Sequence, residues 1–171
     1  DLDALRSAVR RETRLIVTNF PHNPTGATLS RPELDEVASI VRQSNAVWLS
    51  DEVYRFSEYD DADRLPAAVD ICERAVSLGV MSKAFGLAGL RIGWIATHDQ
   101  ELLRKCSAFK DYTTICCSGP SEVLSIIALR VRQRILDRNR QIVLSNLSLL
   151  DGFFHQHSDR FRWARPRAMR W

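Results

Sequence analysis

The chain has 171 residues, of which 45% are hydrophobic and 26% are charged, a balance typical of a globular protein with a buried core. No apolar run approaches the roughly 18 residues of a membrane span, no basic-then-apolar leader opens the chain, and the four cysteines show no C-x-x-C spacing. We therefore expect a cytoplasmic protein of one domain, or of one domain and part of another, with reduced thiols, no metal site and no membrane partner.

Arginine is concentrated late in the chain, although the formal net charge is only +3. The basic stretch comprises Arg130, Arg132, Arg134, Arg138 and Arg140, and arginines recur from residue 160 to residue 170. Acidic residues interrupt it, and no aromatic platform for base stacking accompanies it. We favour a solvated helix face and no nucleic-acid partner, and a steep salt dependence of binding would be needed to support the alternative.

Helix and strand patterns alternate in the first part of the chain. Residues 2–12 have the amphipathic spacing of a short helix, and residues 15–18 form a β-branched run typical of a buried strand. The strand stops at residues 19–26, where two prolines and a glycine predict a rigid loop. Ser30 and Glu33 have the spacing of a capping box, which predicts a helix that ends near Ser44 and Asn45.

The later strands end in polar or glycine-rich stretches. We expect them at residues 46–49, 74–78 and 91–96. Strands that alternate with helices indicate an α/β architecture in which helices flank a mostly parallel sheet. Ligands bind such sheets outside the carboxyl ends of the strands. The stretches around Asn23, Asp51 and Lys83 each follow a strand, so we expect them to share one site.

The second half of the chain is expected to be helical. Apolar spacing predicts a helix from residue 100, a second helix opened by Ser118, and a long third helix that begins near Arg134. The long helix is typical of a connection that leaves a large domain for a smaller one. We therefore expect a boundary between residues 133 and 134, and a strand of the smaller domain that starts at residues 161–164.

Lys83 stands between an apolar run and a loop that contains Gly86, Gly89 and Gly93, and Arg91 follows it by eight residues. Glycine lets the backbone approach a ligand closely. A lysine that is desolvated or close to a cation can form a Schiff base with an aldehyde cofactor that carries a phosphate. For Lys83 alone, an ordinary surface lysine is the simpler interpretation. The polar stretches after the two earlier strands favour a cofactor site instead.

Three motifs occur in a fixed order along the chain. They are Asn23-Pro24-Thr25-Gly26, Asp51-Glu52-Val53-Tyr54, and the stretch from Ser82 to Trp94. With these motifs the chain resembles the class I/II (fold type I) pyridoxal-phosphate-dependent aminotransferases, and the resemblance extends over nearly all its length. It implies that residues 1–133 are the C-terminal part of the large cofactor-binding domain. Residues 134–171 would be the connecting helix and the start of a truncated small domain.

The resemblance implies that Lys83 forms a Schiff base with pyridoxal 5′-phosphate and moves a proton between the substrate α-carbon and the cofactor. Asp51 would face the pyridine nitrogen and keep it protonated, so that the ring can accept electrons. Tyr54 and Asn23 would hydrogen-bond the phenolic oxygen. The expected catalytic residues are Lys83, Asp51 and Tyr54.

Two further residues of the third motif are implied to bind the phosphate of the cofactor. Arg91 offers a bidentate fork of N–H donors, and the Ser82 hydroxyl can add another bond. The Asn23–Pro24 peptide is expected to be cis, as is frequent in the family. The cofactor-binding set implied by the resemblance is Asn23, Asp51, Tyr54, Ser82, Lys83 and Arg91.

Each of these residues also has a purely structural interpretation. Asp51 could cap a helix, Tyr54 could be a core aromatic with a satisfied hydroxyl, and Asn23 could be a turn residue before proline. Arg91 could belong to a surface ion pair, which would contribute little stability. His22, beside the first motif, is expected to be a spectator rather than a ligand.

The chain departs from the family pattern at several points. Val80 stands where many relatives carry a second phosphate-binding serine. Nothing before residue 19 matches the glycine- and serine-rich phosphate loop or the ring-stacking aromatic, and the arginine that binds the substrate carboxylate would lie beyond residue 171. Arg165 and Arg167 do not qualify for that role merely as arginines. We therefore expect a fragment with little activity alone, which in the full-length protein belongs to a homodimer.

Three kinds of function remain open on the sequence. The favoured one is amino-group transfer between an amino acid and a 2-oxo acid, in amino acid metabolism. A lyase, a decarboxylase or a cyclising synthase of the same fold would use the same lysine, because substrate orientation decides which bond breaks. The third is a remnant domain without catalysis, which would carry no cofactor adduct on Lys83. Fold-level resemblance does not name the substrate.

Overall fold

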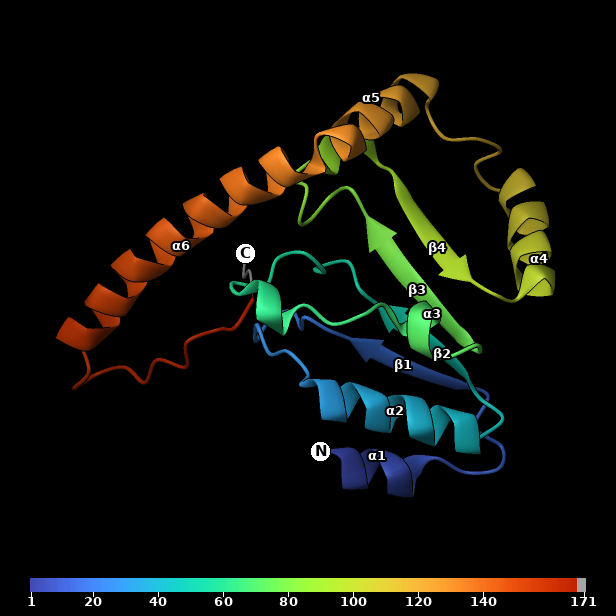
Figure 1. Ribbon diagram of the computed structural model, residues 1–171, viewed down its shortest axis with the longest axis horizontal. Helices are drawn as coiled ribbons and strands as arrows, with labels where there is room; N and C mark the ends of the chain where they lie inside the picture. The colour runs from blue at the N-terminus through green and yellow to red at the C-terminus, as the bar shows by residue number, and fades with distance from the viewer. Residues whose placement is uncertain (169–171) are drawn as a thin grey trace.

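The computed structural model describes residues 1–168, which form a four-stranded sheet with flanking helices (Figure 1). The strands lie side by side in chain order, and they are β1 (Leu15–Asn19), β2 (Val47–Asp51), β3 (Ala75–Val80) and β4 (Gly93–Thr97). β1, β2 and β3 are parallel, and β4 is antiparallel to β3. The predicted α/β class with a mostly parallel sheet is confirmed. Residues 81–92, between β3 and β4, contain only a 3₁₀ turn and no crossover α-helix of the kind that usually joins parallel strands.

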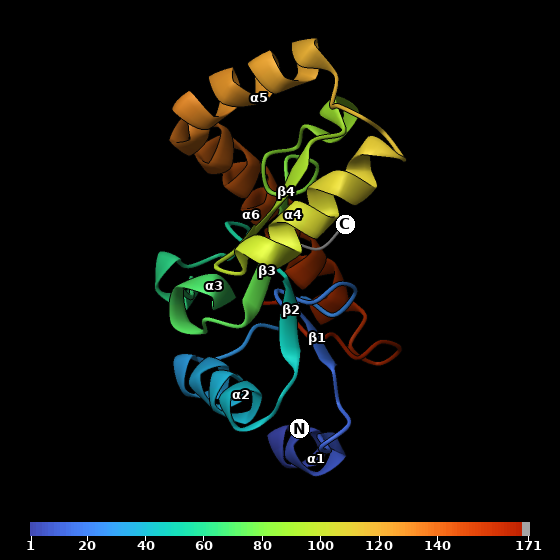
Figure 2. The ribbon, with the colours of Figure 1, turned by 90° about the vertical axis from the view of Figure 1, so that its right-hand side faces the viewer.

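Helices from the first half of the chain cover one face of the sheet. They are α1 (Leu2–Ala8), α2 (Arg31–Gln43) and α3 (Ala68–Ile71), and Figure 2 shows α2 and α3 on the same side of the parallel strands. Successive side chains of a strand point to opposite faces. Ile16 and Trp48 point into this layer and are 5% and 0% exposed, whereas Leu15 and Val17 are 53% and 59% exposed. One face of the sheet is therefore packed and the other is open.

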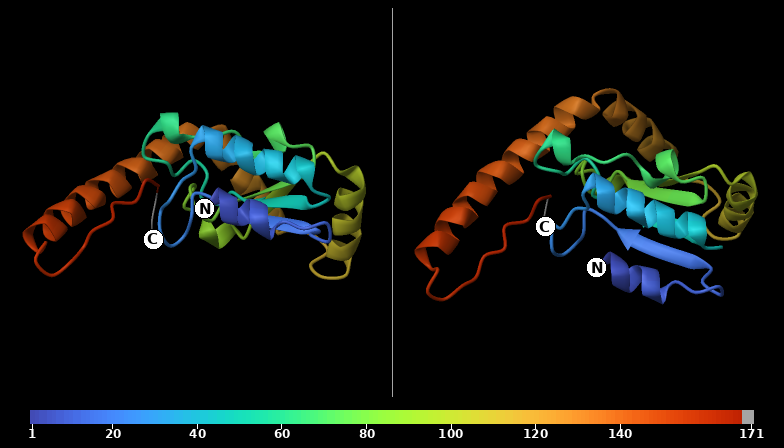
Figure 3. Two further views of the ribbon diagram at one scale, coloured as in Figure 1. Left: turned by 90° about the horizontal axis from the view of Figure 1, so that it is seen from below. Right: turned by 60° about the horizontal axis from the view of Figure 1, so that its bottom comes forward.

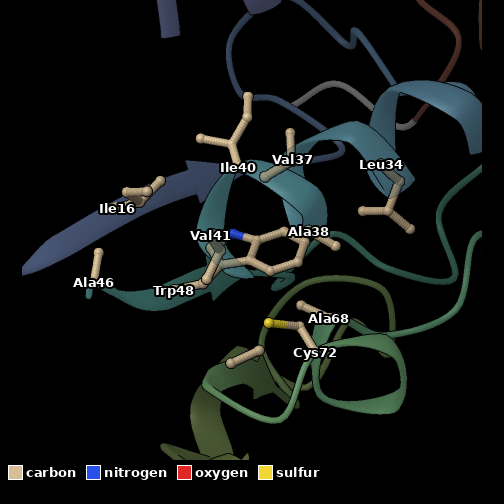
Figure 4. Close-up of a cluster of buried hydrophobic side chains, with 11 residues drawn as sticks. Ile16, Leu34, Val37, Ala38, Ile40, Val41, Ala46, Trp48, Ala68 and Cys72 are labelled. Carbon is tan, nitrogen blue, oxygen red and sulfur yellow. The ribbon is translucent and has the colours of Figure 1, made fainter. Parts of the chain in front are cut away.

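The packed face contains the larger core (Figure 4). The capping box predicted for α2 is present, with the Ser30 and Glu33 side chains each accepting the other's main-chain N–H. Trp48 lies within the core, and its indole N–H donates to Thr18 Oγ1 at 2.8 Å. The cluster comprises Ile16, Leu34, Val37, Ala38, Ile40, Val41, Ala46, Trp48, Ala68, Cys72 and Ala75.

The second half of the chain is helical, with α4 (Gln100–Asp111), α5 (Gly119–Arg130) and α6 (Arg132–Gln156). A smaller core joins the connection after β3 to α5 and α6, and it comprises Met81, Ala84, Phe85, Ala128 and Leu136. α6 projects away from the sheet as a long rod, and residues 157–168 run back from its far end (Figure 3). Within residues 1–168, no helix is both long enough and apolar enough to cross a membrane.

Two element predictions are wrong. α1 ends at Ala8 instead of residue 12, where the β-branched Val9 takes an extended conformation (φ −75°, ψ 124°). Residues 161–164 form no strand in the described part of the chain. Trp163 stacks on Phe154 with the ring centroids 4.5 Å apart, so this segment packs through aromatic contact rather than through main-chain pairing. Turns of the 3₁₀ type occur at η1 (Asp61–Asp63) and η2 (Ala88–Leu90).

Candidate active site

The candidate site lies at the carboxyl edge of the parallel strands. In the register of the sheet, Asn19 at the end of β1 is opposite Asp51 at the end of β2. The loop that carries Asn23 follows β1, the turn that carries Tyr54 follows β2, and the loop that carries Lys83 follows β3. Parallel strands end at the same edge, so the sheet brings these three connections close to one another.

Tyr54 joins two of these connections. It is 4% exposed, its hydroxyl accepts a hydrogen bond from Asn23 Nδ2 at 2.8 Å, and Lys83 Nζ lies 5.4 Å from the centroid of its ring. A cation at this distance is attracted by the quadrupole of an aromatic ring. The structure therefore brings Asn23, Tyr54 and Lys83 together. Tyr54 is therefore both a core aromatic with a satisfied hydroxyl and a residue that contacts the other two motifs.

Asn19 ties the first motif to the second. Its Oδ1 accepts the main-chain N–H of Asn23 at 3.3 Å, and its Nδ2 donates to the main-chain oxygen of Asp51 at 3.3 Å. Asn19 was not recognised from the sequence as a site residue. Its place directly before the first motif, at the end of a predicted strand, is the signal that could have identified it.

The loop between β1 and α2 is shaped by two cis peptide bonds and by hydrogen bonds within the loop. The Asn23–Pro24 peptide is cis, as expected, and so is the Phe20–Pro21 peptide. His22 Nδ1 is hydrogen-bonded to Thr25 Oγ1 at 2.8 Å, so the imidazole interacts within the loop. The main-chain N–H of Gly26 donates to the oxygen of His22 at 2.7 Å, which closes the loop around Asn23.

Asp51 points toward the open face of the sheet, because Ser50 before it is buried on the packed face. The Asp51 carboxylate is half-buried, and its Oδ1 accepts the N–H of Val53 at 3.2 Å. No helix begins at Asp51, so the bond closes a local turn instead of capping a helix. This bond orients the carboxylate at the strand end.

Glu52 anchors the turn that follows Asp51. Its Oε1 accepts hydrogen bonds from the N–H of Ala68 at 2.8 Å and from Ser77 Oγ at 2.9 Å. Ser77 Oγ also accepts the N–H of Val69 at 3.1 Å, so the pair serves the first turn of α3. No local signal in the sequence distinguishes Glu52 from a solvated acid, because its partners come from other segments of the chain.

The loop that carries Lys83 is held by the smaller core. Met81, Ala84 and Phe85 are buried, whereas Lys83 is half-buried. Asn139 on α6 donates from Nδ2 to the main-chain oxygen of Ala84 at 2.9 Å. The loop is therefore anchored on both sides of Lys83, by Met81 before it and by Ala84 and Phe85 after it. Asn139 is a supporting residue that the sequence did not reveal.

The two residues implied to bind phosphate are less closely connected to this group. Arg91 has a left-handed backbone (φ 55°) and an exposed side chain, and its Nη1 donates to the main-chain oxygen of Ala88 at 3.1 Å. A guanidinium has five N–H donors, so this contact leaves donors for an anion. Ser82 is half-buried beside Lys83. The structure thus brings Asn23, Tyr54 and Lys83 into contact and turns Arg91 toward its own loop.

The sequence of this chain matches a known protein family. The model of the family described as aminotransferase class I and II matches residues 1–164. The chain belongs to this family.

The chain spans about a third of the length of the curated relatives it matches. A probable N-succinyldiaminopimelate aminotransferase from Mycobacterium tuberculosis is 39% identical over 131 residues, which are 75% of this chain and 33% of that protein. Capreomycidine synthase from Streptomyces vinaceus is 36% identical over 129 residues, with the same two coverages. The crystal structure of a PLP-dependent aminotransferase from Streptococcus suis superposes with a TM-score of 0.87 at 34% identity, over 98% of this chain and 43% of that chain.

Pyridoxal 5′-phosphate is the cofactor that this family and its structural neighbour imply, and the side chains present fit it. The fit rests on the chemistry of the donor set at the strand ends. Lys83 has an amine that could react with an aldehyde, Tyr54 and Asn23 form a polar pair that could bind a phenolic oxygen, and Asp51 has a carboxylate that could face a pyridine nitrogen. Arg91 has N–H donors that could bind a phosphate.

Proposed function

We propose that the protein containing this chain is a pyridoxal-phosphate-dependent aminotransferase that moves an amino group between an amino acid and a 2-oxo acid through Lys83. The observation that carries the proposal is the position of Lys83 Nζ over the ring of Tyr54, whose hydroxyl is bonded to Asn23. Membership of the class I and II family supports it. Because the chain spans about a third of its relatives, we expect little activity from these 171 residues alone.

Each proposed role follows from the chemistry of the group. When bound, pyridoxal phosphate supplies an aldehyde and an electron-accepting ring. Lys83 would hold the aldehyde through its amine, and the same amine, when free, would carry a proton to and from the substrate α-carbon. Asp51 would keep a proton on the pyridine nitrogen. Tyr54 and Asn23 would bind the phenolic oxygen.

The proposal also covers the phosphate and the organisation of the chain. Arg91 and Ser82 would hold the phosphate, and Arg91 keeps N–H donors for it beyond the one bonded to the oxygen of Ala88. Residues 1–133 belong to the C-terminal part of the cofactor-binding domain, and residues 134–171, of which 169–171 lie outside the described chain, belong to the connecting helix and the start of the small domain. We further propose that the full-length protein is a cytoplasmic homodimer that acts in amino acid biosynthesis.

Borohydride reduction in the presence of pyridoxal phosphate tests the central step. The chain contains three lysines, Lys83, Lys105 and Lys110, and the last two lie on α4, so each preparation carries its own controls. We expect a reduced cofactor adduct on the peptide that contains Lys83, at substoichiometric pyridoxal phosphate, and none on the α4 peptides. Equal labelling of all three lysines in folded protein would contradict the proposal, and absence of any adduct would favour the remnant domain.

A cyclising synthase is the second candidate, because capreomycidine synthase is among the relatives. The two candidates differ in the fate of the cofactor in the full-length protein. An aminotransferase leaves the cofactor in its amine form, and a 2-oxo acid returns it to the aldehyde form. A synthase, lyase or decarboxylase regenerates the aldehyde form without a 2-oxo acid. Absorbance spectra recorded with an amino acid, before and after addition of a 2-oxo acid, separate them.

A further inference from the structure

Residues 165–168, which we call the return segment, lie between the two connections that carry Asn23 and Tyr54. The N–H of Arg167 donates to the main-chain oxygen of Gly26 at 3.0 Å, and the N–H of Tyr59 donates to the oxygen of Arg167 at 3.4 Å. One residue of the return segment therefore bonds through its main chain to both connections. The contact is made by a part of the chain more than a hundred residues away in sequence.

The return segment is also closely packed. Ala168 is 0% exposed and pairs with Glu58 in an isolated antiparallel bridge. The Arg167 guanidinium is 3.1 Å from Asp63 Oδ1. Pro166 is buried, so three successive residues are each held against the body of the protein.

Gly26 is the point where this packing admits no side chain. Its backbone has φ +69°, and a Cβ at this position would lie 2.4 Å from the Cβ of Pro166 and 3.2 Å from the main-chain oxygen of Ala168. The neighbouring atoms belong to a rigid ring and to the main chain, so they cannot move aside as a flexible side chain could. The last residue of the Asn23 motif is thus fitted to the return segment.

The two residues that contact Arg167, Gly26 and Tyr59, each lie a few residues from one end of the hydrogen bond between Asn23 and Tyr54. Gly26 is joined to His22 by a main-chain bond of 2.7 Å that encloses Asn23, and Asn23 donates to Tyr54. On the other side, the N–H of Ser57 donates to the oxygen of Tyr54 at 3.1 Å, in the turn that leads to Tyr59. Displacement of the return segment would therefore shift donor and acceptor relative to each other.

We propose that the return segment is a positioning element of the candidate site, which holds Asn23 against Tyr54 by clamping the two connections together. It couples the part of the chain that follows α6 to the geometry at the strand ends. Its meaning for catalysis rests on the proposed function, because Asn23 and Tyr54 are there the partners of the phenolic oxygen. The hydrogen bond itself forms without cofactor, so the coupling can be measured independently.

The test uses side-chain amide NMR signals of asparagine in the full chain, without cofactor. Asn23→Asp identifies the Asn23 signals by their loss, and Tyr54→Phe gives their position when the hydrogen bond is absent. We expect Gly26→Ala to move the Asn23 signals to the Tyr54→Phe position. Gly152→Ala is the matched control, because a Cβ there meets nothing within 4 Å, and it should leave them unchanged. Unchanged Asn23 signals in folded Gly26→Ala would overturn the proposal.

A second pair of variants decides the question if Gly26→Ala does not fold. Arg167→Pro removes the N–H that donates to Gly26, whereas Arg167→Ala keeps this N–H and removes only the contact with Asp63. We expect the Asn23 signals to move in Arg167→Pro and to stay in Arg167→Ala. The same signal positions in both variants would overturn the proposal.

The outcome is separable from that of the borohydride experiment. If Lys83 takes no adduct while the Asn23 signals move in Gly26→Ala and Arg167→Pro, the proposed function is wrong and the positioning role of the return segment stands. If Lys83 is labelled and the Asn23 signals do not move in Gly26→Ala or Arg167→Pro, the proposed positioning role of the return segment is wrong and the proposed function stands.

Discussion

α2 and α5 differ in burial although their sequences begin alike. α2 has 13 residues and α5 has 12, each follows a serine, and each has a proline in its first turn. α2 buries Leu34, Val37, Ala38, Ile40 and Val41. α5 buries only Ser125 and Ala128, and its exposed apolar residues include Val123, Leu124, Ile126 and Ile127. The comparison teaches that apolar content does not decide burial, because α2 lies on a sheet, whereas no sheet covers α5 within residues 1–168.

The same contrast separates the two faces of the sheet. The face under α2 contains Trp48 and the larger core, whereas the opposite face exposes Leu15 and Val17. Exposed apolar patches of this kind mark contact surfaces or sites of aggregation. Asp51 points toward the open face, so the chemistry of the candidate site and the packing of the core lie on opposite sides of one strand.

The largest expected effect is at the centre of the packed face. Trp48→Ala removes a fully buried ring and its hydrogen bond to Thr18, and we expect a loss of about 3–5 kcal/mol in the free energy of unfolding. Phe109→Ala on the exposed surface of α4 is the aromatic control, with an expected change within about 0.5 kcal/mol. Urea unfolding followed by circular dichroism measures both. Similar losses would show that the two regions do not differ as described.

Adjacent residues of β1 sharpen the contrast between the faces. Ile16→Ala should cost about 2–4 kcal/mol, because it leaves a cavity in the core under α2. Val17→Ala should change the free energy of unfolding by less than about 0.5 kcal/mol, because its side chain is exposed. The same urea titration checks the pair. A large cost at Val17 would mean that another surface covers the open face in solution, for example in a dimer.

The serines that precede α2 and α5 provide a smaller test. The Ser30 side chain accepts the N–H of Glu33, so Ser30→Ala should cost about 1 kcal/mol. Ser118 precedes α5 but makes no capping bond through its side chain, so Ser118→Ala should have almost no effect. Thermal unfolding of the two variants measures the difference. Equal shifts in the melting temperature would contradict the assigned caps.

Glu58 tests what burial does to a charged side chain. Burial raises the pKa of the Glu58 carboxyl above its ordinary value of 4.5, and the cations of Arg64 and Arg55 only partly oppose this. The folded state then holds the proton more tightly than the unfolded state, so stability is lost as the pH rises from about 4.5 through the folded pKa. We expect Glu58→Gln to be more stable than the native protein at neutral pH.

Measurement at acidic pH is the control for the Glu58→Gln variant. The stability difference between Glu58→Gln and the native protein should shrink below the unfolded pKa, where both side chains are neutral. Urea unfolding at acidic and neutral pH measures it. A variant that is less stable at neutral pH would show that the contact between Glu58 and Arg64, at 3.8 Å, outweighs the burial of the carboxylate.

Local signals predicted a large share of the fold. The β-branched run before Asn19 gave β1, and the spacing of Ser30 and Glu33 gave the start of α2, because strand and cap preferences depend on neighbouring residues. Residues 161–164 were misjudged, since an apolar extended stretch becomes a strand only if another strand pairs with it. The motifs predicted which residues would gather at the strand ends, and Asn23, Tyr54 and Lys83 do so.

The sequence by itself determined the family motifs, the class of the fold and the start of α2, because each depends on residue types at short spacing. The tertiary structure alone decided that α2 is buried and α5 is not, that Asn139 holds the lysine loop, and that the return segment meets Gly26. These outcomes depend on which distant segments come together. A local sequence pattern does not predict a contact between residues that are far apart in the sequence and become neighbours only when the chain folds.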